Sequence, residues 1–260
     1  MPMITARVPA ILLAGFLAAC TANPSTMSET SSLEGKAWIL SALPGQTLPP
    51  EKMVTLRFEA GKASGSDGCN RYSAPYTSTG QSLAISPRGI STMMACPPEL
   101  MQLAAGYTTA LGDSRAWRIE DGRLQLLAAD GRTLAMLAAQ PASLAGTSWR
   151  VTAINNGKQA VVSVLSGSTL TLSFAADGQA SGSAGCNRYH TRYQGEAAQL
   201  RFQVPAATRM ICPGEGLMEQ EQAFLKALST VASARHEGNR LELRTAEGAL
   251  AVALVREERE

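Results

Sequence analysis

The stretch "SGSDGCNRY" at residues 64–72 recurs almost unchanged as "SGSAGCNRY" at residues 181–189. The two stretches differ at one position, which is Asp67 in the first and Ala184 in the second. Flanking features recur in the same order and at nearly the same spacing, which coincidence does not preserve over roughly a hundred residues. These flanking matches are Leu33-x-Gly35-x-x-Trp38 with Leu144-x-Gly146-x-x-Trp149, Leu56-x-Phe58 with Leu172-x-Phe174, and Met94-x-Cys96-Pro97 with Met210-x-Cys212-Pro213. The chain therefore carries a tandem duplication.

Each copy is predicted to consist of strands with one helix among them. Alternating apolar and polar residues predict strands at 53–60 and 168–178, each followed by a turn and a returning strand. Helical spacing over residues 97–111, which open with two prolines, predicts a helix whose counterpart follows Cys212. A closing hairpin is predicted at the end of each copy. The predicted fold class is α+β, mainly antiparallel β, and the three tryptophans are expected in the core.

The length fits two ordinary domains. With 260 residues, each copy has about 110, enough to bury a core of its own. We place the first domain at residues 33–139, a linker at 140–143 and the second domain at 144–257.

Charge and histidine content argue against several functions. The 23 basic and 21 acidic residues nearly cancel without a basic stripe, so no nucleic-acid partner is predicted. The two histidines, His190 and His236, have no counterparts in the first copy, and the repeated motif carries no pair of carboxylates. The sequence therefore predicts no catalytic residue, no metal ligand and no cofactor.

The N-terminus points to the cell envelope. Arg7 precedes an apolar run at 8–19 that is too short to span a bilayer and is typical of a signal peptide. The run ends in Leu-Ala-Ala-Cys20, which resembles a bacterial lipobox. The resemblance implies that residues 1–19 are removed and that acyl chains, palmitate among them, anchor Cys20 to the membrane. An ordinary secretory signal and an uncleaved anchor are the alternatives.

Residues 20–32 have little to bury and read as a flexible tether. Thr21 stands where an Asp would retain an enteric lipoprotein at the inner membrane. An outer-membrane location facing the periplasm is therefore favoured.

The four remaining cysteines are divided equally between the copies. Only the pairs Cys69–Cys96 and Cys186–Cys212 make each domain self-contained, and disulfides persist outside the cytosol. A zinc site is disfavoured because no C-x-x-C pair occurs. A thiol-redox role stays open, since Cys96 and Cys212 lie just before a helix.

The repeated motif allows two interpretations. Its glycines suit a tight chain path and its cysteines a staple, which favours a structural corner. In the second interpretation, the Asn-Arg-Tyr segments form a recognition surface. The candidate surface residues are Asn70, Arg71, Tyr72, Asn187, Arg188, Tyr189 and Arg209.

The phrase "SGSxGCNRY", followed by "T-x-M-x-C-P" and a helix, resembles the META domain, the module of HslJ-type heat-shock lipoproteins. The similarity covers residues 33–138 and 144–256. It implies an open or cracked antiparallel β-barrel with one helix in each domain. It also implies an envelope-stress role, including tolerance to novobiocin, without an established enzyme activity. The tandem is a departure from single-copy members, and Met93 stands where the family usually has Arg.

The sequence is compatible with three classes of function. An enzyme has the least support. A binding module could dock on an envelope protein partner as an assembly pilot or a peptidase inhibitor. A non-catalytic stress-tolerance lipoprotein ranks first, and it is compatible with binding.

Overall fold

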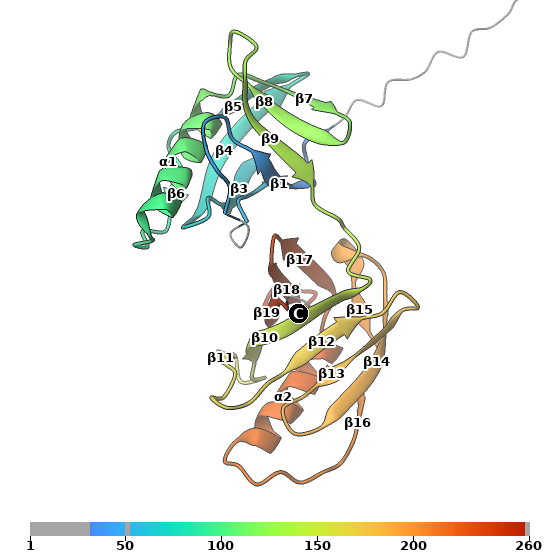
Figure 1. The fold of residues 1–260 in the computed structure, drawn as a ribbon. Coiled ribbons are helices and arrows are strands. Elements are labelled where there is room, and N and C mark those ends of the chain that lie inside the picture. The colour runs from blue at the N-terminus through green and yellow to red at the C-terminus, as the bar shows by residue number, and fades with distance from the viewer. Residues whose placement is uncertain (1–31, 50–52, 258–260) are drawn as a thin grey trace, which may run out of the picture. The chain divides into compact units, whose positions relative to one another are not determined.

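The computed structural model describes residues 32–49 and 53–257 (Figure 1). The predicted signal peptide, Cys20 and tether residues 21–31 lie outside these ranges. From Leu33 onward the chain forms one compact unit. Within the described ranges, no helix combines the length and the apolar character needed to cross a bilayer.

Each repeat is built from antiparallel strands and one long helix. The first repeat contains β1 (Ala37–Ala42), β2 (Thr55–Glu59), β3 (Lys62–Ser66), β4 (Arg71–Thr79), β5 (Ser82–Ile85), β6 (Ile90–Ser91), α1 (Pro98–Asp113), β7 (Ala116–Glu120), β8 (Arg123–Leu127) and β9 (Thr133–Ala139). The second contains β10 (Thr147–Asn155), β11 (Val161–Ser163), β12 (Thr171–Phe174), β13 (Gln179–Ser183), β14 (Arg188–Gln194), the short 3-10 helix η1 (Ala197–Gln199), β15 (Arg201–Phe202), β16 (Ala206–Ala207), α2 (Leu217–Ser229), β17 (Ser233–Glu237), β18 (Arg240–Arg244) and β19 (Leu250–Arg256).

The two sheets differ in how far they close. The first has the order β3-β2-β1-β9-β8-β7-β5-β4-β6, and an additional β3–β4 pairing nearly closes it into a barrel. The shortest strand pairing in this sheet is between β5 and β7, which share the single residue pair Ser82–Ala116. The second has the order β15-β14-β13-β12-β10-β19-β18-β17, and its described end strands, β15 and β17, are not paired with each other. The fold is therefore α+β and mainly antiparallel β, with one nearly closed and one open sheet.

The repeats agree in strand register, as a duplication requires. Trp38 lies opposite Leu56 in the first, and Trp149 lies opposite Leu172 in the second. A register shift interrupts the pairing of β1 with β9 and recurs where β10 pairs with β19. Such bulges bend a strand and help to curve the sheet. Trp38, Trp149 and Trp117 are all buried, as predicted.

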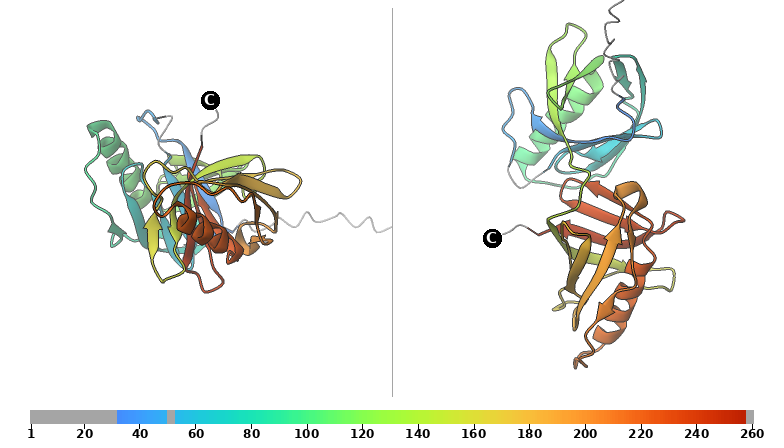
Figure 2. Two further views of the ribbon diagram at one scale, coloured as in Figure 1. Left: turned by 90° about the horizontal axis from the view of Figure 1, so that it is seen from below. Right: turned by 90° about the vertical axis from the view of Figure 1, so that its right-hand side faces the viewer.

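One helix covers each core. Helix α1 buries Leu103, Tyr107 and Leu111 in the first core, and α2 buries Phe224 and Leu228 in the second. Figure 2 shows each helix lying against the sheet of its own repeat. Helix α1 begins two positions after Cys96 and α2 five positions after Cys212, so the start of each helix lies close to the second cysteine of its repeat.

Candidate functional site

A disulfide fixes the repeated motif in each repeat. Cys69 is bonded to Cys96 and Cys186 to Cys212, the pairing that the duplication predicts, with a Cα–Cα separation of 5.9 Å in both. The first cysteine of each pair lies in the β3–β4 or β13–β14 turn, and the second lies just before the helix. The bridge therefore staples a sheet corner to the start of the helix.

The second glycine of the motif is needed for its backbone conformation. Gly68 has a φ of 96° and Gly185 a φ of 102°. These values lie in the left-handed region, which side chains with a Cβ disfavour. The tight turn ahead of each cysteine requires glycine for this reason.

The first glycine of the motif is needed for a different reason, which is space. A Cβ built on Gly65 would lie 2.1 Å from the backbone oxygen of Thr55, and one on Gly182 would lie 2.1 Å from that of Thr171. Neither glycine has a positive φ. The close approach of two backbone segments therefore excludes any larger residue at either position.

The motif tyrosine binds the same backbone oxygen. The hydroxyl of Tyr72 donates to the Thr55 oxygen at 2.8 Å, and that of Tyr189 donates to the Thr171 oxygen at 2.8 Å. Burial raises the pKa of both phenols well above the ordinary value, so they remain neutral donors. In the first repeat the Tyr107 hydroxyl lies 3.0 Å from that of Tyr72.

The motif asparagine connects the corner to the "T-x-M" segment. In each repeat its side-chain oxygen accepts one hydrogen bond from a threonine hydroxyl and one from a methionine backbone N–H. The pairs are Asn70 with Thr92 (2.9 Å) and Met94 (2.8 Å), and Asn187 with Thr208 (2.6 Å) and Met210 (2.8 Å). The two sequence motifs are therefore halves of one structure, joined by a disulfide and by these bonds.

In the first repeat, a buried carboxylate closes the turn. Oδ1 of Asp67 accepts the backbone N–H of Cys69 at 2.9 Å and also that of Asn70. This is a local Asx-type turn, in which a side chain takes up nearby backbone donors. The second repeat has Ala184 at this position and cannot form it.

The second repeat obtains its carboxylate from the helix instead. Glu221 on α2 accepts the backbone N–H of Asn187 at 2.8 Å and its side-chain amide at 2.9 Å. Counted from the aligned core positions of the two helices, the equivalent residue on α1 is Ala104, which is also buried. The difference between Asp67 and Ala184 is therefore balanced by an opposite difference between Ala104 and Glu221.

We expect Glu221→Ala to destabilise the second domain by about 2 kcal/mol, because it leaves two buried N–H donors of Asn187 without an acceptor. Ala184→Asp should recover part of this loss when combined with Glu221→Ala, by rebuilding the turn of the first repeat. Urea unfolding of the full chain measures both effects. A double variant no more stable than Glu221→Ala would show that the two carboxylates are not equivalent.

The burial of two candidate residues corrects part of the hypothesis that the Asn-Arg-Tyr segments form a recognition surface. Asn187 and Tyr189 are only 1% and 3% exposed. The prediction that they form a recognition surface is wrong, because their polar atoms bind the interior of their own domain. Asn70 and Tyr72 are half-buried and make the equivalent bonds.

The three arginines of the candidate set are exposed, but they differ in their contacts. Nη2 of Arg71 lies 3.0 Å from the carboxylate of Glu237, whose side chain is 6% exposed. Arg188 has the same place in the second motif, and Arg209 lies in the "T-x-M" segment. Arg71 is therefore engaged within the chain.

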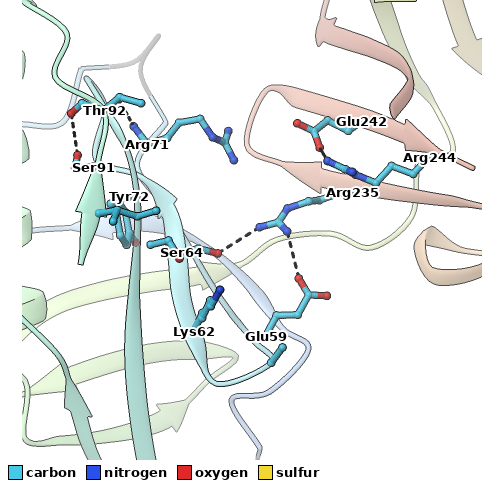
Figure 3. A pocket seen from close by; sticks show the side chains of 13 residues that line it. Glu59, Lys62, Ser64, Arg71, Tyr72, Ser91, Thr92, Arg235, Glu242 and Arg244 are labelled. Carbon is cyan, nitrogen blue, oxygen red and sulfur yellow. Dashed lines mark hydrogen bonds and ion pairs between the residues drawn. The ribbon is translucent and has the colours of Figure 1, made fainter. Parts of the chain in front are cut away.

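Arg71 also lines a cavity of about 740 Å³ (Figure 3). Arg235 reaches into the same space and donates to Glu59 at 3.3 Å and to Ser64 at 3.3 Å. Arg244, on the wall of the cavity, pairs with Glu242. All three arginines therefore pair with carboxylates of the chain, and Lys62 adds a further basic side chain to the lining.

Neither histidine is placed as a catalytic base would be. His190 is exposed on β14. His236 is buried, its Nε2 lies 3.0 Å from the backbone oxygen of Gly238, and its ring packs edge-on against Trp149 at 5.1 Å. Burial lowers the pKa of His236, so the ring is held neutral. Across residues 32–49 and 53–257, no three His, Cys, Asp or Glu side chains gather as a metal site would require.

The corner, its staple and the helix that follows recur in both repeats, and a family comparison matches each repeat separately. The family model described as "META domain" matches residues 31–141 and again residues 142–258. The chain belongs to the META domain family. It carries two META domains in tandem, and each contains a complete stapled corner.

Solved structures similar to this chain each match less than half of it. An NMR structure of a protein from Burkholderia xenovorans is 29% identical, with a TM-score of 0.38, over 45% of this chain and 85% of that one. A crystal structure of a DUF4847 family protein from Bacteroides vulgatus is 14% identical, with a TM-score of 0.32, over 45% of this chain and 96% of that one. Among curated proteins, none matches.

Proposed function

We propose that this tandem META protein is a non-catalytic lipoprotein of the bacterial cell envelope. Acyl chains on Cys20 hold it at the outer membrane, facing the periplasm, where it contributes to envelope-stress resistance and novobiocin-type tolerance. The observation that carries the proposal is the lipobox-like Leu-Ala-Ala-Cys20, placed directly ahead of a short polar tether and two META domains.

The stapled corners support a location outside the cytosol. Both domains bridge a corner to a helix through a disulfide, and reducing compartments do not maintain such bonds. In the cytosol both disulfides would be reduced and would no longer stabilise the domains.

The use of the motif side chains supports a role other than catalysis. The asparagine and tyrosine of each copy make hydrogen bonds to backbone and side-chain groups of their own domain. The cysteines are joined in pairs and so are not free nucleophiles. The residues of the repeated motif thus build the domain itself.

Replacing Cys20 by serine is expected to abolish lipidation and to release the protein from the membrane fraction. Metabolic labelling with palmitate, followed by fractionation on a sucrose gradient, measures both in the source bacterium. Cys69→Ser/Cys96→Ser serves as the matched control, because it removes cysteines and leaves the lipobox intact. Labelling that survives Cys20→Ser would contradict the anchor.

A deletion strain tests the stress role. We expect it to be more sensitive to heat and to novobiocin, and we expect the wild-type gene, but not Cys20→Ser, to restore resistance. Unchanged sensitivity of the deletion strain would refute the stress role and leave the anchor to be judged by the labelling experiment.

A further inference from the structure

Exposed apolar side chains are concentrated in one loop of each domain. The first apolar loop (residues 88–95) and the second apolar loop (residues 204–211) both lead to the second cysteine of a bridge. Six of the eleven large apolar residues that are exposed among the described residues lie in these two loops. They are Ile90 (77%), Met93 (99%), Met94 (56%), Val204 (84%), Met210 (57%) and Ile211 (89%).

Both loops are held firmly. The disulfide anchors the residue that follows each loop, and the motif asparagine binds the backbone N–H of Met94 or Met210. Short strands, β6 and β16, attach the loops to β4 and β14. The apolar side chains are therefore presented to solvent by an ordered frame, and the same frame presents the equivalent methionines Met94 and Met210 in the two domains.

The charges of the loops share one sign. The first apolar loop contains Arg88 and the second contains Arg209, and neither contains an acidic residue. Both arginines are exposed. Apolar side chains beside a basic one are the combination that binds the boundary between headgroups and acyl chains of an anionic bilayer.

We propose that the two apolar loops dock on the surface of an anionic phospholipid bilayer. The proposal rests on the proposed lipid anchor in one respect, which is reach. Only residues 21–32 separate Cys20 from the first META domain, a span of at most about 40 Å when fully extended. A chain anchored at Cys20 keeps its first META domain within reach of the leaflet, and a second loop of the same chemistry adds a linked contact.

Vesicle binding tests the proposal directly. We would use residues 21–260 without lipid, which include every described residue, and vesicles of phosphatidylethanolamine with phosphatidylglycerol or of phosphatidylcholine alone. Flotation is expected to recover the protein with the anionic vesicles and to recover much less with phosphatidylcholine. The variant Met93→Ser/Met94→Ser/Met210→Ser/Ile211→Ser should lower the vesicle partition coefficient about tenfold or more.

A control variant separates the loops from apolar surface in general. Val161→Ser/Val162→Ser removes two exposed apolar residues on β11, which are 48% and 39% exposed and lie outside both loops. It should bind vesicles as the wild type does. Circular dichroism of all variants shows whether the substituted chains are folded.

Several outcomes would overturn the proposal. These are a wild-type chain that does not float at low salt, a loop variant that binds as well as the Val161/Val162 control, or self-association that the loop variant abolishes without any vesicle binding. The last result would assign the loops to a second copy of the chain. None of these outcomes depends on palmitate labelling of Cys20, so the anchor and the docking surface can fail separately.

Discussion

Replacing Gly65 or Gly182 by alanine is expected to destabilise the corresponding META domain by about 3 kcal/mol. The added Cβ would lie 2.1 Å from the backbone oxygen of Thr55 or Thr171. That oxygen belongs to a strand in the middle of the sheet and also receives the motif tyrosine hydroxyl, so it cannot shift without breaking a second contact. The effect should appear in both domains, because the geometry is the same in both.

Urea unfolding of the full chain, followed by tryptophan fluorescence, measures this loss. Gly112→Ala is the matched control in the first domain, since Gly112 lies in α1 and a Cβ there would meet nothing within 4 Å. That variant should be neutral or up to about 1 kcal/mol more stable, because alanine favours a helix. A Gly65→Ala variant as stable as Gly112→Ala would disprove the close approach.

Removing one disulfide is the second large effect. Cys69→Ser/Cys96→Ser and Cys186→Ser/Cys212→Ser should each cost the affected domain about 3 kcal/mol, as expected for loops whose ends lie 27 and 26 residues apart. The physical reason is that the unfolded chain regains the freedom that the cross-link denied it. Reduction of the wild type should reproduce the loss in both domains.

The comparison of reduced and substituted chains serves as the control. Adding reductant to Cys69→Ser/Cys96→Ser should lower the stability of the second domain and leave the first unchanged. If reductant alters neither domain of the wild type, the staples do not stabilise the fold as proposed.

Local chemistry explains why much of the corner could be predicted from the sequence. The need for glycine and the pairing of cysteines follow from residue type and from the duplication. The link between Asn70 and Met94 was harder to foresee, because it joins residues 24 positions apart. Both ends belong to recognisable motifs, which the bridge and the pairing of β4 with β6 bring together.

The part that could not be predicted depends on packing. Asn187 and Tyr189 look like surface residues because a polar strand surrounds them in the sequence. The packing of Tyr189 against Phe224 of α2, with ring centres 5.5 Å apart, decides their burial. Glu221 gave no signal either, since it reads as one more acidic residue on a helix and its partner lies 34 positions earlier.

The exchange of carboxylates also limits how the two halves of this gene can recombine. A crossover that joined the first corner to the second helix would place the carboxylates of Asp67 and Glu221 in the same buried corner. Two negative charges there repel each other. The reciprocal crossover would join Ala184 to Ala104 and supply no acceptor at all. Although the two motifs are nearly identical in sequence, each corner is compatible only with the helix of its own repeat.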